Sequence, residues 1–284
     1  MLRADRSLRL NIGGAPELPH VQALEDLYAY PCRPRRGDVI MIAGRSGSGK
    51  STLALFLAAE MNLPTLYFSA DMSGYEASIK VACSRLEEDV DGIEEMIERG
   101  SESAALVYDT LRGVNITFSF GEITWRGVEA EVEAYVELHN QYPEVIVIDN
   151  LMDVEGCDTE YAAQQEAMQF LHNLARVTGA TVIIMHHATD KSRDAEADPY
   201  RPPARKDIKN GLGEKPQLTL GVALNPFNNE FSIAVLKQRM GRSDQTARSY
   251  VTIQAIPSHS SYRKKEPLQA MRYVAGKLEE EIDV

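Results

Sequence analysis

The sequence predicts a three-layer α/β fold with a mainly parallel twisted sheet, helices on both faces and a C-terminal β-hairpin at one edge. Apolar runs typical of buried strands lie at 38–43, 65–69, 144–149 and 181–185. Segments with helical patterns separate these runs, which implies right-handed crossovers and parallel pairing of the strands. Two later runs, 217–224 and 231–237, are joined by NPFNNE and indicate the hairpin.

The other elements follow from apolar periodicity and from glycine punctuation. Helices are expected at 51–61, 73–86, 92–112, 127–141 and 159–178, and further strands at 114–120 and 249–255. These assignments divide the chain into an N-terminal arm (1–36), a core (37–257) and a polar C-terminal tail (258–284).

The composition limits the class of protein. The chain has 284 residues, a formal net charge of −12 and 44% hydrophobic residues, as a globular protein does. The acidic balance argues against a protein that coats nucleic acid through a uniformly basic surface. There is no apolar run of membrane-spanning length and no secretory signal. The three cysteines match no metal-binding spacing, so we expect a cytoplasmic protein with no membrane partner.

A glycine-rich segment at 44–51 fits the pattern G-x-x-x-x-G-K-[ST] between a predicted strand and an apolar helix. Its glycines let backbone N–H groups surround phosphate oxygens, and the helix N-terminus adds the positive end of a dipole. Lys50 is expected to reach the β- and γ-phosphates of ATP, and the Ser51 hydroxyl to hold Mg²⁺. The predicted nucleotide-binding residues are Gly44, Arg45, Ser46, Gly47, Ser48, Gly49, Lys50, Ser51 and Thr52.

Two carboxylates follow predicted strands. Asp149 ends the strand at 144–149, at the sheet edge that faces the ligand in α/β folds, and is expected to bind Mg²⁺ together with Ser51. Asp71 follows the strand at 65–69, where a carboxylate can act as the base that deprotonates water. Asp71 can equally cap the helix that begins near Ser73, and the spacing leaves both roles open.

Four segments together resemble the RecA-like ATPase superfamily, and most closely the motor domain of DnaB-type hexameric helicases. They are LYFSADMS (66–73), VIVIDNLMDV (145–154), VIIMHHATDKSR (182–193) and AVLKQRMGRSDQT (234–246). The His-His pair in the third segment is similar to small plasmid RepA-type hexameric helicases. The resemblance spans residues 37–256 and implies a RecA-like ATPase core.

The resemblance also implies roles for particular residues. Asp71 stands where the family usually has a catalytic Glu, and His187 stands at the position of the family's sensor residue, which is usually Gln in DnaB proteins. Adjacent strand residues point to opposite faces, so at most one histidine of the pair can face the nucleotide, and we expect His187 to do so. Lys237 and Arg239 match the family's K-x-R element, which implies contact with the γ-phosphate held by the neighbouring subunit.

The same family binds single-stranded DNA through loops that follow the second acid and the sensor strand. Here the first loop, 153–161, is acidic, whereas five cations face two carboxylates across 201–215. Phosphate backbones favour the second loop. The DNA-binding residues expected from this match are Lys191, Arg193, Arg201, Arg205, Lys206 and Lys209.

These observations predict an ATP hydrolase that acts as a DNA helicase or translocase on single-stranded DNA. Implied partners are further copies of the chain in a ring, expected to be a hexamer, and other DNA replication proteins. A RecA-like recombinase and an ATP-switched accessory or mediator protein of DNA replication remain alternatives. A small-molecule kinase fits poorly, because the hairpin followed by KQR is not expected of one.

Overall fold

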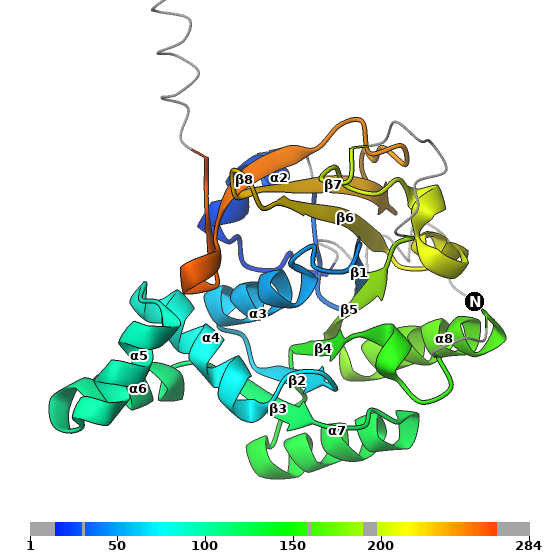
Figure 1. Cartoon of the computed structure of the whole chain (residues 1–284). Helices are drawn as coiled ribbons and strands as arrows, with labels where there is room; N and C mark the ends of the chain where they lie inside the picture. The colour runs from blue at the N-terminus through cyan, green and yellow to red at the C-terminus, as the bar shows by residue number, and fades with distance from the viewer. Residues whose placement is uncertain (1–14, 30–31, 158–160, 190–197, 266–284) are drawn as a thin grey trace, which may run out of the picture.

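The computed structural model describes residues 15–29, 32–157, 161–189 and 198–265. Its strands form a nine-stranded sheet in the order β3-β2-β4-β5-β1-β6-β7-β8-β9 (Figure 1). Their bounds are Val39–Gly44 (β1), Thr65–Ser69 (β2), Ile116–Phe120 (β3), Val145–Asp149 (β4), Thr181–His187 (β5), Leu218–Asn225 (β6), Glu230–Gln238 (β7), Val251–Ile256 (β8) and Ser261–Arg263 (β9). Pairing is parallel from β3 to β6 and antiparallel from β6 to β9. The predicted α/β class, with a parallel sheet and a C-terminal hairpin, is confirmed.

Helices cover both faces of the sheet (Figure 1). They are Glu25–Ala29 (α2), Lys50–Met61 (α3), Gly74–Leu86 (α4), Val90–Arg99 (α5), Ser101–Arg112 (α6), Trp125–His139 (α7) and Tyr161–Thr178 (α8). The α3 face is closed by α2, α3 and part of α4, and the opposite face by α7 and α8. Helices α4, α5 and α6 share a small core of their own, built on Ile79, Ile93 and Val107.

The structure divides the helix predicted at 92–112 into two. Gly100 lies between α5 and α6 with φ +66° and ψ −165°, a conformation open to glycine and not to an L side chain. The apolar pattern continues through the break because both helices contribute to the same small core. The apolar periodicity therefore predicted the buried face of this segment correctly, but the prediction of one continuous helix was wrong.

The ends of the predicted core also differ from expectation. In the segment assigned to the N-terminal arm, Leu18, Leu24 and Leu27 are buried against the sheet of the same chain. At the other end, β9 lies in the segment assigned to the polar tail and pairs with β8. The first segment packs against the sheet and the second extends it by one strand, and no local periodicity reveals either contact.

Strand polarity positions the candidate site. The carboxyl ends of β1, β2, β4 and β5 lie at one edge, where Ser69 is level with Asp149 and Gly44 with His187. Crossovers of parallel strands gather the residues that follow these strands into one crevice. Within the described part of the chain, no helix combines the length and apolar character needed to span a membrane.

Candidate nucleotide site

The loop at 44–51 connects β1 to α3 and requires glycine at three positions. Gly47 and Gly49 have φ of +70° and +80°. A Cβ on Gly44 would lie 2.3 Å from the Ser48 Oγ and 2.8 Å from the Val222 carbonyl oxygen. These glycines allow the backbone to turn tightly enough for the N–H groups at the start of α3 to point at an anion.

Two polar side chains lie inside this loop. The Lys50 Nζ donates hydrogen bonds to the carbonyl oxygens of Gly44 (3.2 Å) and Arg45 (2.9 Å), which places a buried ammonium against the loop. The Ser48 hydroxyl is also buried and has no hydrogen-bond partner among the described residues. An anion with several oxygens, such as a polyphosphate, would satisfy both groups.

The second acid lies directly across from the loop. The Ser51 hydroxyl donates to Asp149 Oδ1 at 3.0 Å, and the Tyr67 hydroxyl donates to Asp149 Oδ2 at 3.0 Å. Tyr67 comes from β2 and is fully buried. The carboxylate is therefore fixed at both oxygens, with Oδ1 beside the serine hydroxyl.

Burial raises the pKa of Asp149 despite the hydrogen bonds from Ser51 and Tyr67 and the charge of Lys50, all of which lower it. The nearby Asp71 carboxylate raises the pKa of Asp149 further. A buried carboxylate with a neighbouring negative charge favours a cation beside it. Ser51 and Asp149 offer hard oxygen donors, the chemistry that Mg²⁺ prefers, so the residues fit a magnesium-bound polyphosphate.

The structure separates the two roles that the sequence left open for Asp71. Helix α4 is capped by Ser73, whose hydroxyl accepts from the Glu76 N–H at 3.2 Å while Glu76 accepts from the Ser73 N–H at 2.8 Å. Asp71 is therefore not the cap. It is exposed, and its charge also raises the pKa of Asp153. This location leaves its carboxylate available to a water molecule at the site.

The two histidines at the end of β5 face opposite sides of the sheet. His186 is fully buried, and its Nε2 donates to the Lys209 carbonyl oxygen at 3.1 Å. Burial lowers the pKa of His186 to about 4. The neighbouring Met185 belongs to the core on the α3 face, so strand alternation directs His187 to that face, beside Gly44.

Lys237 and Arg239 lie at the opposite edge of the sheet. Gln238 pairs with Leu218, and Leu218 pairs with Ile40, four residues before Gly44. At about 3.3 Å per residue, this is about 13 Å along the strand from the phosphate-binding loop. The Lys237 ammonium does not reach toward the phosphate-binding loop, because it donates to the carbonyl oxygens of Glu214 and Pro216. Neither cation completes the loop of its own chain.

The second of the loops expected to bind DNA is called the basic loop here, and the structure describes its residues 198–215. Arg201 and Lys206 are exposed and Lys209 is half-buried, whereas the Arg205 guanidinium contacts Glu214 at 3.1 Å. The remaining two predicted DNA-binding residues, Lys191 and Arg193, lie outside the described residues. The loop is tied to the phosphate-binding loop by Arg45, whose Nη1 donates to the carbonyl oxygen of Pro199 at 2.7 Å.

Sequence reasoning missed two residues of this region. Tyr67 holds Asp149, and its role depends on β2 pairing with β4, which the chain does not reveal locally. Arg248 lies beside the basic loop, because it and Arg201 line one cavity although 47 positions separate them in the sequence. By contrast, the Ser73 cap has a visible signature, since Ser-x-x-Glu is the capping-box pattern.

Comparison with known proteins places the chain in a family. The AAA_25 family, described as an AAA domain, matches residues 23–193. Two curated phage proteins are similar over most of their length. The Gene 65 protein of Mycobacterium phage L5 is 28% identical over 78% of this chain and 84% of its own. That of Mycobacterium phage D29 is 29% identical over 77% of this chain and 95% of its own.

Solved structures share the fold at low sequence identity. A solved ATPase domain superposes with a TM-score of 0.72 and 16% identity, covering 92% of this chain and 95% of that one. A DnaB-like replicative helicase, described with its interactions with primase, superposes with a TM-score of 0.73 and 16% identity. This chain covers 65% of that helicase. The RecA-like fold of a DnaB-type motor domain is thereby confirmed.

Proposed function

The chain belongs to the AAA_25 family of AAA domains and is a P-loop ATPase, and we propose that it is an ATP-driven DNA helicase or translocase. It acts on single-stranded DNA as a ring, expected to be a hexamer, in DNA replication. The fold shared with a solved ATPase domain and with a DnaB-like replicative helicase supports this proposal. The primase named with the latter supports other replication proteins as partners.

One observation carries the proposal. The groups that hold a triphosphate lie at the carboxyl edge of the sheet, whereas Lys237 and Arg239 lie at the other edge, about 13 Å away along the strands. Arginine fingers that clamp a transferring phosphoryl group raise the rate of NTPases by ~10³–10⁵. If the fingers act here, they act on the nucleotide of an adjoining protomer. Head-to-tail contacts of this kind form a closed ring when the rotation between neighbouring protomers closes, and a helical filament when it does not.

The chain's own residues define the division of labour at the site. Lys50 and the N–H groups at the start of α3 would bind the phosphate oxygens. Ser51 and Asp149 would hold Mg²⁺, which would neutralise charge on the phosphates. Tyr67 fixes the carboxylate of Asp149. Asp71 orients the attacking water and accepts its proton on a carboxylate oxygen. His187 lies beside Gly44, where it can respond to the γ-phosphate.

Purified protein tests the proposal. ATP hydrolysis is measured with and without oligo-dT, strand separation is measured on a forked duplex, and Lys50→Ala serves as the inactive control. The proposal expects DNA-stimulated hydrolysis, unwinding and closed rings by electron microscopy. A rate of ATP hydrolysis that is the same with and without oligo-dT, together with no unwinding of the forked duplex, contradicts the proposal. Helical filaments in place of rings favour the recombinase alternative.

A further inference from the structure

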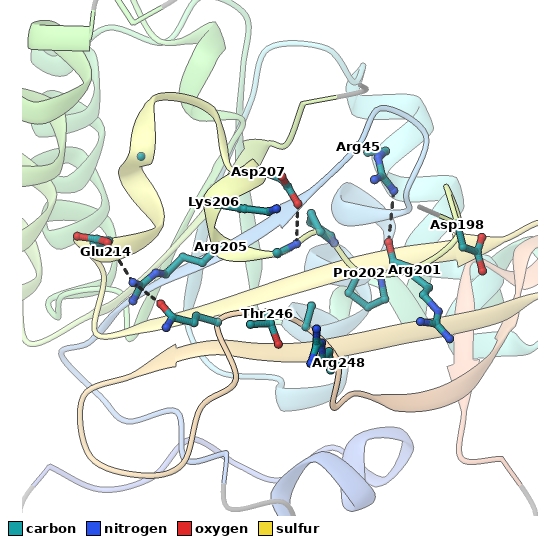
Figure 2. Close-up of a pocket in the computed structure, with 15 residues that line it drawn as sticks. Arg45, Asp198, Arg201, Pro202, Arg205, Lys206, Asp207, Glu214, Thr246 and Arg248 are labelled. Atoms are coloured by element: carbon teal, nitrogen blue, oxygen red, sulfur yellow. Dashed lines mark hydrogen bonds and ion pairs between the residues drawn. The ribbon is translucent and has the colours of Figure 1, made fainter. Parts of the chain in front are cut away.

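A cavity of about 720 Å³ lies between the basic loop and the segment that joins β7 to β8 (Figure 2). Its lining includes five cationic side chains and three carboxylates. The chain as a whole carries a net charge of −12, whereas the lining of this cavity has a positive net charge. The cationic residues are Arg45, Arg201, Arg205, Lys206 and Arg248.

The carboxylates of the cavity are engaged by neighbouring donors. Asp198 accepts a hydrogen bond from the Tyr200 N–H at 2.9 Å, and Asp207 accepts one from the Ala204 N–H at 3.1 Å. Glu214 pairs with Arg205 at 3.1 Å. Asp198 and Asp207 therefore stabilise turns of the lining, and Glu214 offsets the charge of Arg205. With five cations against three carboxylates, the lining keeps an excess of positive charge.

Arg205 joins the two walls of the cavity. Its backbone N–H donates to the Gln245 carbonyl oxygen at 2.9 Å, and its Nη2 donates to the Gln245 Oε1 at 2.7 Å. Glu214 is a further partner of its guanidinium, which therefore holds the two walls together and is not counted as a phosphate donor (Figure 2). Arg201 and Arg248 are exposed and come from opposite walls. Arg201 stands 5.9 Å from the centre of the Tyr250 ring.

The wall that carries Arg248 is held in one shape. The Asp244 carboxylate accepts from the Thr246 N–H (2.9 Å), the Thr246 hydroxyl (2.6 Å) and the Ser249 N–H (2.8 Å). These hydrogen bonds lower the pKa of Asp244 to about 2. Ala247 is buried in the core on the α7 and α8 face and anchors the segment. Arg248 therefore projects from an ordered turn, which lowers the entropy cost of binding.

The cavity adjoins the nucleotide site without containing it. Arg45 belongs to the phosphate-binding loop, and its Nη1 donates to the carbonyl oxygens of Pro199 (2.7 Å) and Arg201 (3.3 Å). Lys50, Ser51 and Asp149 do not line the cavity. An anion seated there is a second ligand, separate from the triphosphate.

We infer that this cavity binds phosphodiester groups of single-stranded nucleic acid, with Arg201 and Arg248 as the two guanidinium donors. The inference rests on the proposed function and adds Arg248 and its segment to the nucleic-acid site. Guanidinium groups bind phosphate oxygens in bidentate geometry. Such contacts position a strand and carry no sequence information, so binding is independent of base identity.

Binding of a labelled dT oligonucleotide, followed by anisotropy at several salt concentrations with a non-hydrolysable ATP analogue, tests the inference. Arg248→Ala is expected to weaken binding about tenfold and to reduce the log–log salt slope by about 0.7, the value for one lost phosphate contact on a single strand. Arg248→Lys retains the slope, because lysine still neutralises a phosphate. Arg242→Ala removes the same charge from the same segment outside the cavity and is expected to leave slope and affinity unchanged.

The possible outcomes distinguish a failure of the inferred site from a failure of the proposed function. If wild-type protein binds oligo-dT and Arg248→Ala binds it with the same affinity and slope, the cavity is not the site and the proposed function survives. If Arg248→Ala loses binding of inorganic pyrophosphate but keeps that of oligo-dT, the cavity takes a small anion and the inference fails. If wild-type protein does not bind oligo-dT, the proposed function fails first.

Discussion

Replacing Tyr67 by phenylalanine removes one hydroxyl from the candidate site and leaves the packing of the ring unchanged. That hydroxyl donates to Asp149 Oδ2 at 3.0 Å, and the ring is fully buried in the core on the α3 face of the sheet. A hydrogen bond to a charged group is worth about 1.5–3 kcal/mol. Without it, the buried carboxylate loses the partner that sets its orientation toward Ser51.

Partners of metal ligands typically change metal affinity by 10–100-fold when they are removed. We therefore expect Tyr67→Phe to weaken the apparent affinity for Mg²⁺ by about tenfold. The maximal rate at saturating Mg²⁺ is expected to change much less, because the ligands themselves remain. This split between metal affinity and rate distinguishes a positioning role from general damage to the fold.

The assay is the Mg²⁺ dependence of fluorescent-nucleotide binding, supported by direct Mn²⁺ binding followed by electron paramagnetic resonance. Tyr142→Phe is the matched control, because Tyr142 is exposed. An unchanged Mg²⁺ requirement in Tyr67→Phe, with the protein folded, would refute the reasoning.

Three further predictions concern single residues. Asp71→Asn is expected to lower kcat by about 10²–10⁴ while nucleotide affinity, measured by titration, stays nearly unchanged; a large loss of affinity instead would argue against a role as base. Burial lowers the pKa of His186 to about 4 from 6.5, so the unfolded state binds more protons between these values and stability falls as pH falls. From about pH 7 to about pH 5, wild type should lose about 2 kcal/mol more unfolding free energy than His186→Gln in urea titrations, and equal losses would contradict this. Gly49→Ala places a side chain at φ +80° and 3.0 Å from the Phe231 ring, so calorimetry should show a loss of about 1–2 kcal/mol.

The sequence is most informative where function depends on local backbone geometry. The phosphate-binding loop needs its glycines and its following helix in consecutive positions, so one segment of chain defines it. Asp149 is similar, because an apolar strand that ends in a carboxylate places that carboxylate at the ligand edge of the sheet. The structure brings Ser51 and Asp149 within 3.0 Å of each other.

Features that depend on pairing between distant segments were not predictable. Tyr67 looks like any core residue until β2 is placed beside β4. Arg205 was predicted to contact DNA from its charge and its place in a loop that matches the family, and its contacts with Glu214 and Gln245 join segments far apart in the sequence. Arg248 reaches the cavity only because the β7–β8 segment folds back onto the basic loop.

Two elements of secondary structure, the break at Gly100 and strand β9, were predicted wrongly for a related reason. An apolar pattern reports which face of a segment is buried, and Gly100 changes the chain direction without changing that face. Strand β9 is only Ser261–Arg263 and lies in a polar context, so its assignment depends on its pairing with β8. Such elements follow from the assembled sheet and not from local propensity.

The claim that the nucleotide site is shared between protomers is tested most directly by mixing two inactive variants. Lys50→Ala removes the phosphate-binding side of a site, and Arg239→Ala removes the side contributed by the adjoining copy. In randomly mixed rings, about one quarter of the interfaces combine an intact Lys50 with an intact Arg239. ATP hydrolysis is expected to reappear in the mixture toward that fraction of the wild-type rate. A mixture no more active than either variant alone, or an Arg239→Ala protein that hydrolyses ATP at the wild-type rate, would contradict the shared site.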